Sequence, residues 1–328
     1  MIYRALLTGI SGQDGSYLAE LLLEKGYEVY GVVRRTSQNG LGRIAHIADR
    51  LFLLPGDVTD LSSLERVVRM AMPHEVYNLE SQSYVPYSFD APLQTIEVTG
   101  VGAINVFEAV RLHAPGAKIY QASSSEQFGN ATESPQTETT PFHPISPYAC
   151  AKVLAHLAAQ VYRKTYEMYI SCGIAFNHES PRRGEEFVTR KITQAIGRIK
   201  VGAQQQLSLG NTASRRDWSH AKDIMMGAWL TLQRGIPDEY VFASGVSYSV
   251  KEFYELAFNY AGLDPNAYVN ISARLARPQD IHDFVGDASK AKRELGWSPI
   301  YSFRDLVREM VESECANAEH RDPQSISG

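Results

Sequence analysis

The sequence has few cysteines and no long apolar run, and both absences narrow the class of protein. Only three cysteines occur in 328 residues. Cys150, Cys172 and Cys315 are odd in number and far apart, which argues against a disulfide framework or a metal site. No apolar stretch approaches the roughly 18 residues that a membrane span needs, and the first residues enter a glycine-rich turn too early for a signal peptide. We therefore expect a cytoplasmic protein with no bound metal and no membrane partner.

The sequence also lacks an excess of positive charge. It contains 32 Lys and Arg against 37 Asp and Glu, for a net charge of −5. Nucleic-acid binding usually requires a basic face, so we expect no nucleic-acid partner. The 44% of hydrophobic residues is enough to bury a large core, in one large domain or two smaller ones.

A glycine-rich turn stands between the first expected strand, residues 3–7, and the first expected helix, residues 16–25. Gly9, Gly12 and Gly15 occupy it at three-residue intervals. Glycines at such a turn let the chain approach a phosphate closely, and the helix N-terminus presents its N–H groups to the anion. The spacing differs from G-x-G-x-x-G, but its place between strand and helix predicts a dinucleotide site.

A pair of arginines ends the second expected strand, residues 27–33. Arg34 and Arg35 stand about 20 residues beyond the glycine turn, where NAD-binding proteins carry a carboxylate for the ribose 2′-hydroxyl. Two guanidinium groups favour a 2′-phosphate, so we predict NADP as the cofactor. Arg43 follows in the same basic segment. The alternative is a solvated basic loop.

Strand and helix patterns alternate up to residue 175. Further strands are expected over 51–54, 75–79, 118–122 and 169–175, and helices after a capping box at Ser62 and Glu65 and over 94–112. This alternation predicts an α/β fold with a Rossmann-type, doubly wound parallel sheet. Ligands bind outside the carboxyl ends of such strands, so one rim should hold the glycine turn, Asp57, Ser83, Ser124 and Glu126.

Beyond residue 176 the alternation loosens and predicts a smaller, mixed α/β domain. Helices are expected over 186–201, 221–233, 249–261, 288–295 and 302–314, strands over 207–209 and 240–243, and a polar loop over 177–184. We place an NADP-binding domain at residues 1–175, with returning segments near 217–245, and a discontinuous substrate domain at 176–328. Arginine clusters at 182–183, 215–216 and 274–277 suit a diphosphate-bearing substrate, and scattered surface arginines are the alternative.

Residues 121–152 hold the groups best suited to chemistry. A proline-rich segment ends at Pro147, and apolar residues then recur at helical spacing. Tyr148 and Lys152 therefore lie one turn apart on one helix face. A tyrosine that exchanges a proton near neutral pH needs its pKa lowered from about 10, and we expect the Lys152 ammonium to supply that effect. The alternative is a plain amphipathic helix.

Ser124 and Glu126 precede that helix, at the end of an expected strand. On an extended segment, their side chains would project to the same side. Tyr148 and Ser124 beside a nicotinamide would suit oxidation of an alcohol carbon, with Tyr148 taking the hydroxyl proton. Glu126 could act as a base that removes the proton from the carbon beside the new ketone. A hydroxyl one carbon farther on could then leave as water, and the hydride held by the cofactor could return to the resulting double bond. The alternative for Glu126 is a structural carboxylate.

Nearly the whole sequence resembles the GDP-mannose 4,6-dehydratase family of extended short-chain dehydrogenase/reductases. The matching stretches are TGISGQDGSYLAELLLEKGYEVYGVVRR, VYNLESQSYV, QASSSEQFG, PFHPISPYACAK, FNHESPRRGEEFVTRKI, LGNTASRRDWSHAKD and RPQDIHDFVGDASKAKRELGW. The resemblance implies NADP, a GDP-sugar substrate and a homo-oligomer, either a tetramer or a dimer. It also implies oxidation at C4, loss of water across C5 and C6, and reduction at C6, which give GDP-4-keto-6-deoxy-mannose.

The resemblance assigns roles to individual residues. It makes Tyr148 the base at C4 with Lys152 as partner, Glu126 the base at C5, and Ser124 the hydroxyl that stands where the family usually has Thr. Cofactor contacts are implied at Gly9, Gly12, Gln13, Asp14, Gly15, Arg34, Arg35, Arg43, Asp57, Val58, Leu79, Ser81, Ser83, Tyr148, Lys152, His178 and Arg183. Substrate contacts are implied at Ser83, Ser124, Glu126, Asn177, Val188, Lys191, Gly210, Arg216, Arg277 and Asp280. The loop with Arg35 and Arg43 is implied to reach the cofactor of a neighbouring subunit.

Some positions depart from the family pattern, and these leave alternatives open. Glu80 and Ser81 stand where the family usually has two alanines, Thr99 replaces Asp or Asn, and Asp280 replaces Glu. They leave open a related substrate such as a GDP-manno-heptose. A nucleotide-sugar 4-epimerase or reductase is another alternative, although an epimerase needs no base at C5. The most distant alternative is a non-catalytic NADP-binding protein.

Overall fold

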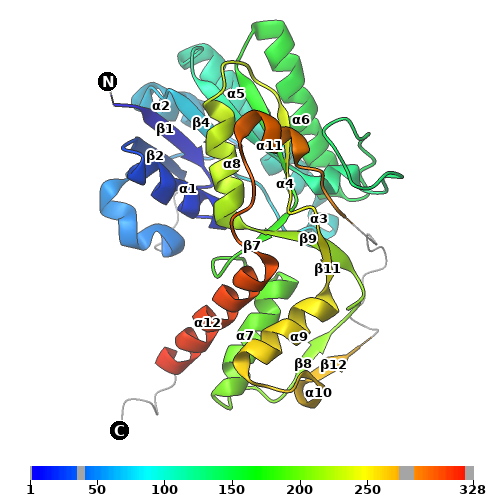
Figure 1. Cartoon of the computed structure of the whole chain (residues 1–328). Coiled ribbons are helices and arrows are strands. Elements are labelled where there is room, and N and C mark those ends of the chain that lie inside the picture. The colour runs from blue at the N-terminus through cyan, green and yellow to red at the C-terminus, as the bar shows by residue number, and fades with distance from the viewer. Residues whose placement is uncertain (1, 35–40, 273–283, 322–328) are drawn as a thin grey trace.

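The computed structural model describes residues 2–34, 41–272 and 284–321. A seven-stranded sheet lies at the centre of its larger lobe, which is the upper part of the molecule in Figure 1. All neighbouring strands of this sheet pair in parallel. From edge to edge the strands are β10 (Glu239–Phe242), β6 (Ile170–Ala175), β5 (Lys118–Ser124), β4 (Glu75–Asn78), β1 (Arg4–Thr8), β2 (Glu28–Val33) and β3 (Phe52–Pro55). The strand order reverses between β1 and β4, where doubly wound sheets open a crevice for a ligand. The predicted fold class is confirmed.

Helices cover both faces of this sheet, so its central strands carry buried apolar residues on both sides. In β1, Ala5 and Leu7 join the core on one face and Leu6 joins the core on the other. The first face carries α1 (Gln13–Glu24), α8 (Ala221–Leu232), α11 (Ser289–Leu295) and the 3₁₀ segment η1 (Gly42–Arg50). The second carries α2 (Leu61–Ala71), α5 (Gly102–His113) and α6 (Pro147–Tyr166).

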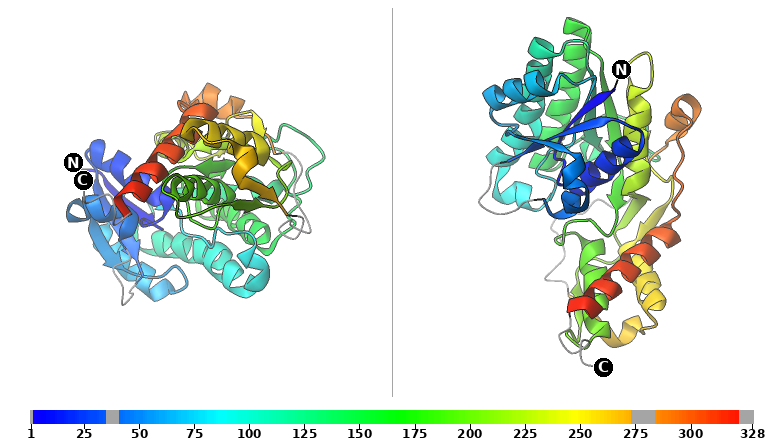
Figure 2. Two further views of the ribbon diagram at one scale, coloured as in Figure 1. Left: turned by 90° about the horizontal axis from the view of Figure 1, so that it is seen from below. Right: turned by 90° about the vertical axis from the view of Figure 1, so that its left-hand side faces the viewer.

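A smaller lobe is built from the second half of the chain (Figure 2). Its core includes Ile192, Trp218, Phe253 and Leu306. It contains the three-stranded sheet β11 (Ser247–Ser249), β9 (Arg215–His220) and β7 (Asn177–Glu179), the pair β12 (Val269–Ile271) and β8 (Leu207–Leu209), and helices α7 (Val188–Lys200), α9 (Val250–Ala261), α10 (Pro265–Tyr268) and α12 (Phe303–Arg321). Helix α8, strand β10 and helix α11 return to the larger lobe, so the chain crosses between lobes several times.

Two expectations about helices need correction. The helix expected over 94–112 is divided into α4 (Pro92–Ile96), a π turn η2 (Glu97–Val101) and α5, after a short α3 (Tyr87–Asp90). Helix α2 is capped by Asp60, whose side chain accepts hydrogen bonds from the N–H groups of Ser62 and Ser63. The prediction of a capping box that begins at Ser62 was therefore wrong. The box of Ser249 with Glu252 is present as expected. No helix in the described residues is long and apolar enough to cross a membrane.

Candidate active site

The glycine turn between β1 and α1 has the geometry that a bound phosphate requires. Gly9 has a φ of +67°, in the left-handed region that favours glycine. A Cβ at Gly15 would meet the Gly9 carbonyl oxygen at 2.3 Å, so a side chain there would push the turn away from the helix. Helix α1 begins without a side-chain cap, which leaves the N–H groups of its first turn for an anion. These features fit the diphosphate of a dinucleotide.

Two side chains at the start of α1 fasten the glycine turn to strand β7. His178 Nε2 donates to Asp14 at 2.9 Å, and His178 Nδ1 donates to the Phe176 carbonyl at 2.7 Å. Both ring nitrogens thus face acceptors, as in an imidazolium ion. Burial opposes the charged forms, but the attraction of the pair lowers the pKa of Asp14 to about 2 and raises the pKa of His178. Gln13 adds a bond to the His178 carbonyl at 3.2 Å.

A cavity of about 480 Å³ lies along the carboxyl ends of β1, β2, β4, β5 and β6. It brings together the glycine turn, the basic end of β2 and the residues expected to do chemistry. The expected site residues that line it are Gly9, Gly12, Gln13, Asp14, Gly15, Arg34, Leu79, Ser81, Ser83, Ser124, Glu126, Tyr148, Lys152, Asn177, His178 and Arg183.

The remaining expected residues do not line this cavity. Arg43 donates from Nε to the Arg182 carbonyl at 2.7 Å, and Arg216 donates to the Arg215 carbonyl at 2.7 Å. The others outside the cavity lining are Asp57, Val58, Val188, Lys191 and Gly210. Arg35, Arg277 and Asp280 lie outside the described residues. For all of these positions, contact with cofactor or substrate stays a prediction.

Ser124 and Glu126 share the cavity wall, but not on an extended segment. Ser124 ends β5 and caps a 3₁₀ turn, η3 (Ser125–Phe128), with its Oγ accepting from the Glu126 N–H at 3.3 Å. Gln127 completes the capping box by accepting the Ser124 N–H at 2.8 Å. The turn holds Glu126 within electrostatic reach of Tyr148, where the carboxylate raises the pKa of the phenol. A capped turn, not strand alternation, therefore places Glu126.

Tyr148 and Lys152 lie one turn apart on α6, as expected, but the expected effect on the phenol is wrong. Burial raises the pKa of Tyr148 to about 12, although a hydrogen bond with Ser124 lowers it. Burial lowers the pKa of Lys152 to about 8. Lys152 Nζ donates to the Ala122 carbonyl at 2.8 Å and lies 5.8 Å from the centre of the Tyr148 ring. Burial therefore outweighs any effect of Lys152 on the phenol in the protein without cofactor.

Sequence reasoning missed how the loop after β4 is held. The Leu79 and Glu80 N–H groups donate to Thr8 Oγ1 at 3.1 and 3.2 Å, and the Gln82 N–H donates to Thr99 Oγ1 at 3.1 Å. Thr99, singled out as a departure from the family pattern, thus positions a cavity wall from its own buried place on the π turn η2. A threonine or serine side chain that accepts a backbone N–H leaves no periodic signal in a sequence.

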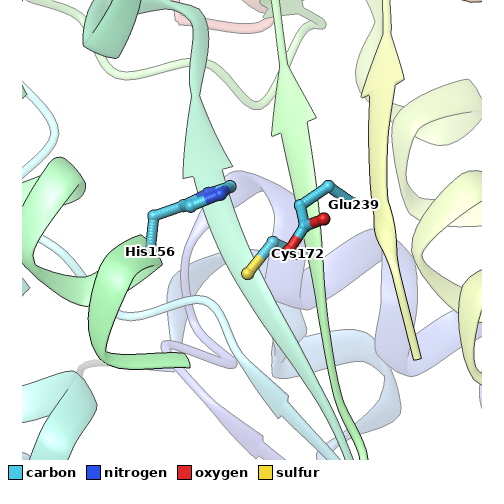
Figure 3. Close-up of side chains that lie close together, drawn as sticks. All are labelled: His156, Cys172 and Glu239. Atoms are coloured by element: carbon cyan, nitrogen blue, oxygen red, sulfur yellow. The ribbon is translucent and has the colours of Figure 1, made fainter. Parts of the chain in front are cut away.

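A second polar cluster joins His156, from the same helix as Tyr148 and Lys152, to one residue of β6 and one of β10. His156, Cys172 and Glu239 place possible ligand atoms within 4.8 Å of one another (Figure 3). The Arg163 guanidinium already pairs with Glu239 at 2.9 Å, and His156 Nδ1 shares a hydrogen bond with Ser123 Oγ at 2.9 Å. A guanidinium at this carboxylate opposes a second cation, so we interpret the cluster as a polar brace between α6, β5, β6 and β10.

The doubly wound sheet, the glycine turn and the Ser, Tyr and Lys side chains at one rim define a nucleotide-binding enzyme of the short-chain dehydrogenase/reductase class. Residues 6–310 match the family model described as GDP-mannose 4,6 dehydratase. The chain therefore belongs to the GDP-mannose 4,6-dehydratase family. It is 50% identical over 322 residues to GDP-mannose 4,6 dehydratase 1 of Arabidopsis thaliana, covering 94% of this chain and 89% of that protein.

A further relative matches the family, and solved structures share the fold. The human GDP-mannose 4,6 dehydratase is 43% identical, with 94% of this chain and 91% of that protein covered. The dTDP-glucose 4,6-dehydratase of Streptomyces venezuelae, solved with NAD, superposes with a TM-score of 0.85 at 25% identity, covering 98% of this chain and 99% of that one. The UDP-glucose 4-epimerase of Thermotoga maritima shares the fold, with a TM-score of 0.85 at 23% identity, over 95% and 99% of the two chains.

Proposed function

We propose that this protein is an NADP-dependent hydro-lyase that converts GDP-mannose into GDP-4-keto-6-deoxy-mannose. Membership of the family supports the substrate and the reaction. The observation that carries the proposal is the meeting of Glu126, Ser124 and Tyr148 in one cavity beside a glycine turn. A 4-epimerase needs no base at C5, so a carboxylate in this position favours a dehydratase.

The first step removes a proton and a hydride from C4 of the sugar. Tyr148 takes the C4 hydroxyl proton, and Ser124 donates a hydrogen bond to the same oxygen. A nicotinamide held beside these side chains would accept the hydride, and the positive charge of its oxidised ring would favour the phenolate of Tyr148. The ammonium of Lys152 adds to that effect, since a pKa of about 8 leaves it mostly protonated at neutral pH.

The second step is elimination of water across C5 and C6. The C4 ketone acidifies the neighbouring C5–H, and Glu126 removes that proton and passes one to the departing C6 hydroxyl. Reduction at C6 then uses the hydride that was taken from C4. The reaction therefore consumes no reductant overall.

NADP is the preferred cofactor in this proposal because Arg34 closes the cavity at the end of β2. Its side chain is 64% exposed, and its guanidinium can meet a 2′-phosphate. The structural relatives differ in this respect: the Streptomyces enzyme was solved with NAD, and the protein described as RMD from Pseudomonas aeruginosa was solved with NADPH.

A homo-oligomer and a cytoplasmic location complete the proposal. Leu154, Leu157 and Val161 on α6 are 39%, 46% and 56% exposed, and we name them the α6 stripe. Such spacing forms one apolar line along a helix, and a second copy of the chain would bury it. The three cysteines are free, as in a reducing compartment.

The substrate and the reaction can be tested with a panel of nucleotide sugars and no added reductant. GDP-mannose should lose the mass of one water molecule, while GDP-manno-heptose and UDP-, dTDP- and CDP-hexoses should react far more slowly. Mass spectrometry of the products identifies both the nucleotide and the reaction. Stoichiometric oxidation of added NADPH, or a product with no loss of water, would contradict the proposal.

A further inference from the structure

Glu80 is a carboxylate placed inside the nucleotide cavity by the loop that follows β4. Its side chain is only 14% exposed and lines the cavity wall. The backbone around it is fixed without any help from the carboxylate. The Glu80 N–H donates to Thr8 Oγ1, and the Glu80 backbone packs so closely on the glycine turn that a Cβ at Gly9 would lie 3.0 Å from the Glu80 nitrogen.

The carboxylate contacts two groups that a dinucleotide would otherwise use. The Gly9 N–H lies close enough to the carboxylate to favour its charged form and so to lower its pKa. The carboxylate also pairs with Arg34, whose Nε lies 3.8 Å from Glu80 Oε1. A glycine-turn N–H and a guanidinium at the end of β2 are the donors expected to face the diphosphate and the adenosine ribose of a cofactor.

The charge around Glu80 is unfavourable for a second anion. Burial and the neighbouring Asp57 carboxylate raise the pKa of Glu80, against the attraction of Arg34. A phosphate on the ribose would have to share one guanidinium with this carboxylate. A ribose hydroxyl, in contrast, could donate a hydrogen bond to it.

We propose that Glu80 determines cofactor specificity, because its carboxylate accepts a hydrogen bond from a ribose hydroxyl and competes with a 2′-phosphate for Arg34. The inference rests on the proposed function in so far as a nicotinamide dinucleotide occupies the cavity. It implies that the chain uses NAD(H) as well as NADP(H), because Glu80 reduces the preference for NADP(H) over NAD(H).

The test measures binding of NADPH and NADH to the full chain by isothermal titration calorimetry. In Glu80→Gln, which keeps the shape and removes the charge, the Kd for NADPH should fall about tenfold and the Kd for NADH should rise about threefold. Glu80→Ala should change the ratio in the same direction. Glu24→Gln removes one charge from an exposed position at the end of α1 and should leave both constants unchanged.

The possible outcomes separate the two ideas. If the unaltered protein binds neither dinucleotide, the proposed cofactor is wrong and the role of Glu80 with it. If it binds a dinucleotide but both Glu80 variants keep the ratio seen in Glu24→Gln, Glu80 does not set specificity and the cofactor stands. Melting temperatures of all four proteins show whether a change in Kd comes from unfolding. If Glu80→Gln is unstable, the Kd ratio of Glu80→Ala tests the proposal instead.

Discussion

At the residue scale, Glu126 and Tyr148 lie on different elements and accept different protons, from C5 and from the C4 hydroxyl in the proposed reaction. Tyr148 is buried on a long helix, and burial raises the pKa of its phenol, which keeps the phenol protonated in the protein without cofactor. The positive charge of an oxidised nicotinamide would lower that pKa. Glu126 stands on a short turn whose cap is Ser124, so one serine hydroxyl both positions the carboxylate and contacts the phenol. Sequence spacing predicted the neighbourhood of these groups. The spacing did not predict the 3₁₀ turn η3, because residues 124–127 are equally compatible with the end of a strand.

Glu126→Gln should separate oxidation from elimination. The amide keeps the size of the side chain but cannot take the C5 proton, so water loss should fall by about 10³. Reversible oxidation at C4 should persist, seen as nicotinamide absorbance at 340 nm that appears with GDP-mannose. The control Glu133→Gln changes an exposed glutamate in the following loop and should be fully active. Unchanged turnover in Glu126→Gln would remove this residue from the mechanism.

At the scale of the element, helix α6 joins the active site to the polar brace. Tyr148, Lys152 and His156 recur at intervals of four residues, so one face of the helix meets β5 with all three. The periodicity of α6 was readable from the sequence, as were the capped start of α9 and the alternation up to β6. The brace was not, since Cys172 and Glu239 come from strands far apart in the chain.

His156 should make the fold sensitive to mild acid. Burial and the Arg163 cation lower the pKa of His156 to about 4, whereas the unfolded chain binds a proton near pH 6.5. Because the folded-state value is the lower one, this contribution to stability is complete above about pH 6.5 and is lost as pH falls toward 4. The free energy of unfolding should drop by about 2 kcal/mol between pH 7 and pH 5 from this residue.

The measurement is urea unfolding of the protein and of His156→Asn at both pH values. Asn retains a group that can bond Ser123 but does not titrate. The remaining neighbours, Glu239, Cys172 and Arg163, stay in both proteins, so their contributions cancel in the difference. An equal loss of stability in the two proteins would show that His156 does not titrate on unfolding.

At the scale of the whole molecule, the sheet supplies the nucleotide cavity and the smaller lobe closes it from one side. The doubly wound parallel sheet follows from the alternation of strand and helix patterns in the sequence, whereas the order of its seven strands was not predicted. The small sheet of β7, β9 and β11 was missed, because Arg215 and Arg216 lie on a strand whose polar residues give no alternation. Residues 177–179 were likewise expected in a loop.

The α6 stripe should hold two copies of the chain together. Leu157→Glu places a charge in the middle of the stripe, and burying an unpaired charge at an interface is costly. Sedimentation velocity should show the oligomer dissociating to a smaller species. Ile300→Glu, at an apolar position that is 80% exposed elsewhere on the surface, should leave the mass unchanged. A monomeric unaltered protein, or no change in Leu157→Glu, would exclude this interface.

The most direct test of the central claim follows the hydride itself. GDP-mannose carrying deuterium at C4 would be converted by the purified protein with unlabelled cofactor, and the product examined by NMR and mass spectrometry. The account predicts that the deuterium lies at C6 of the 4-keto-6-deoxy sugar and that none accumulates in free cofactor. Deuterium left on released nicotinamide, or lost to solvent with protium at C6, would contradict it.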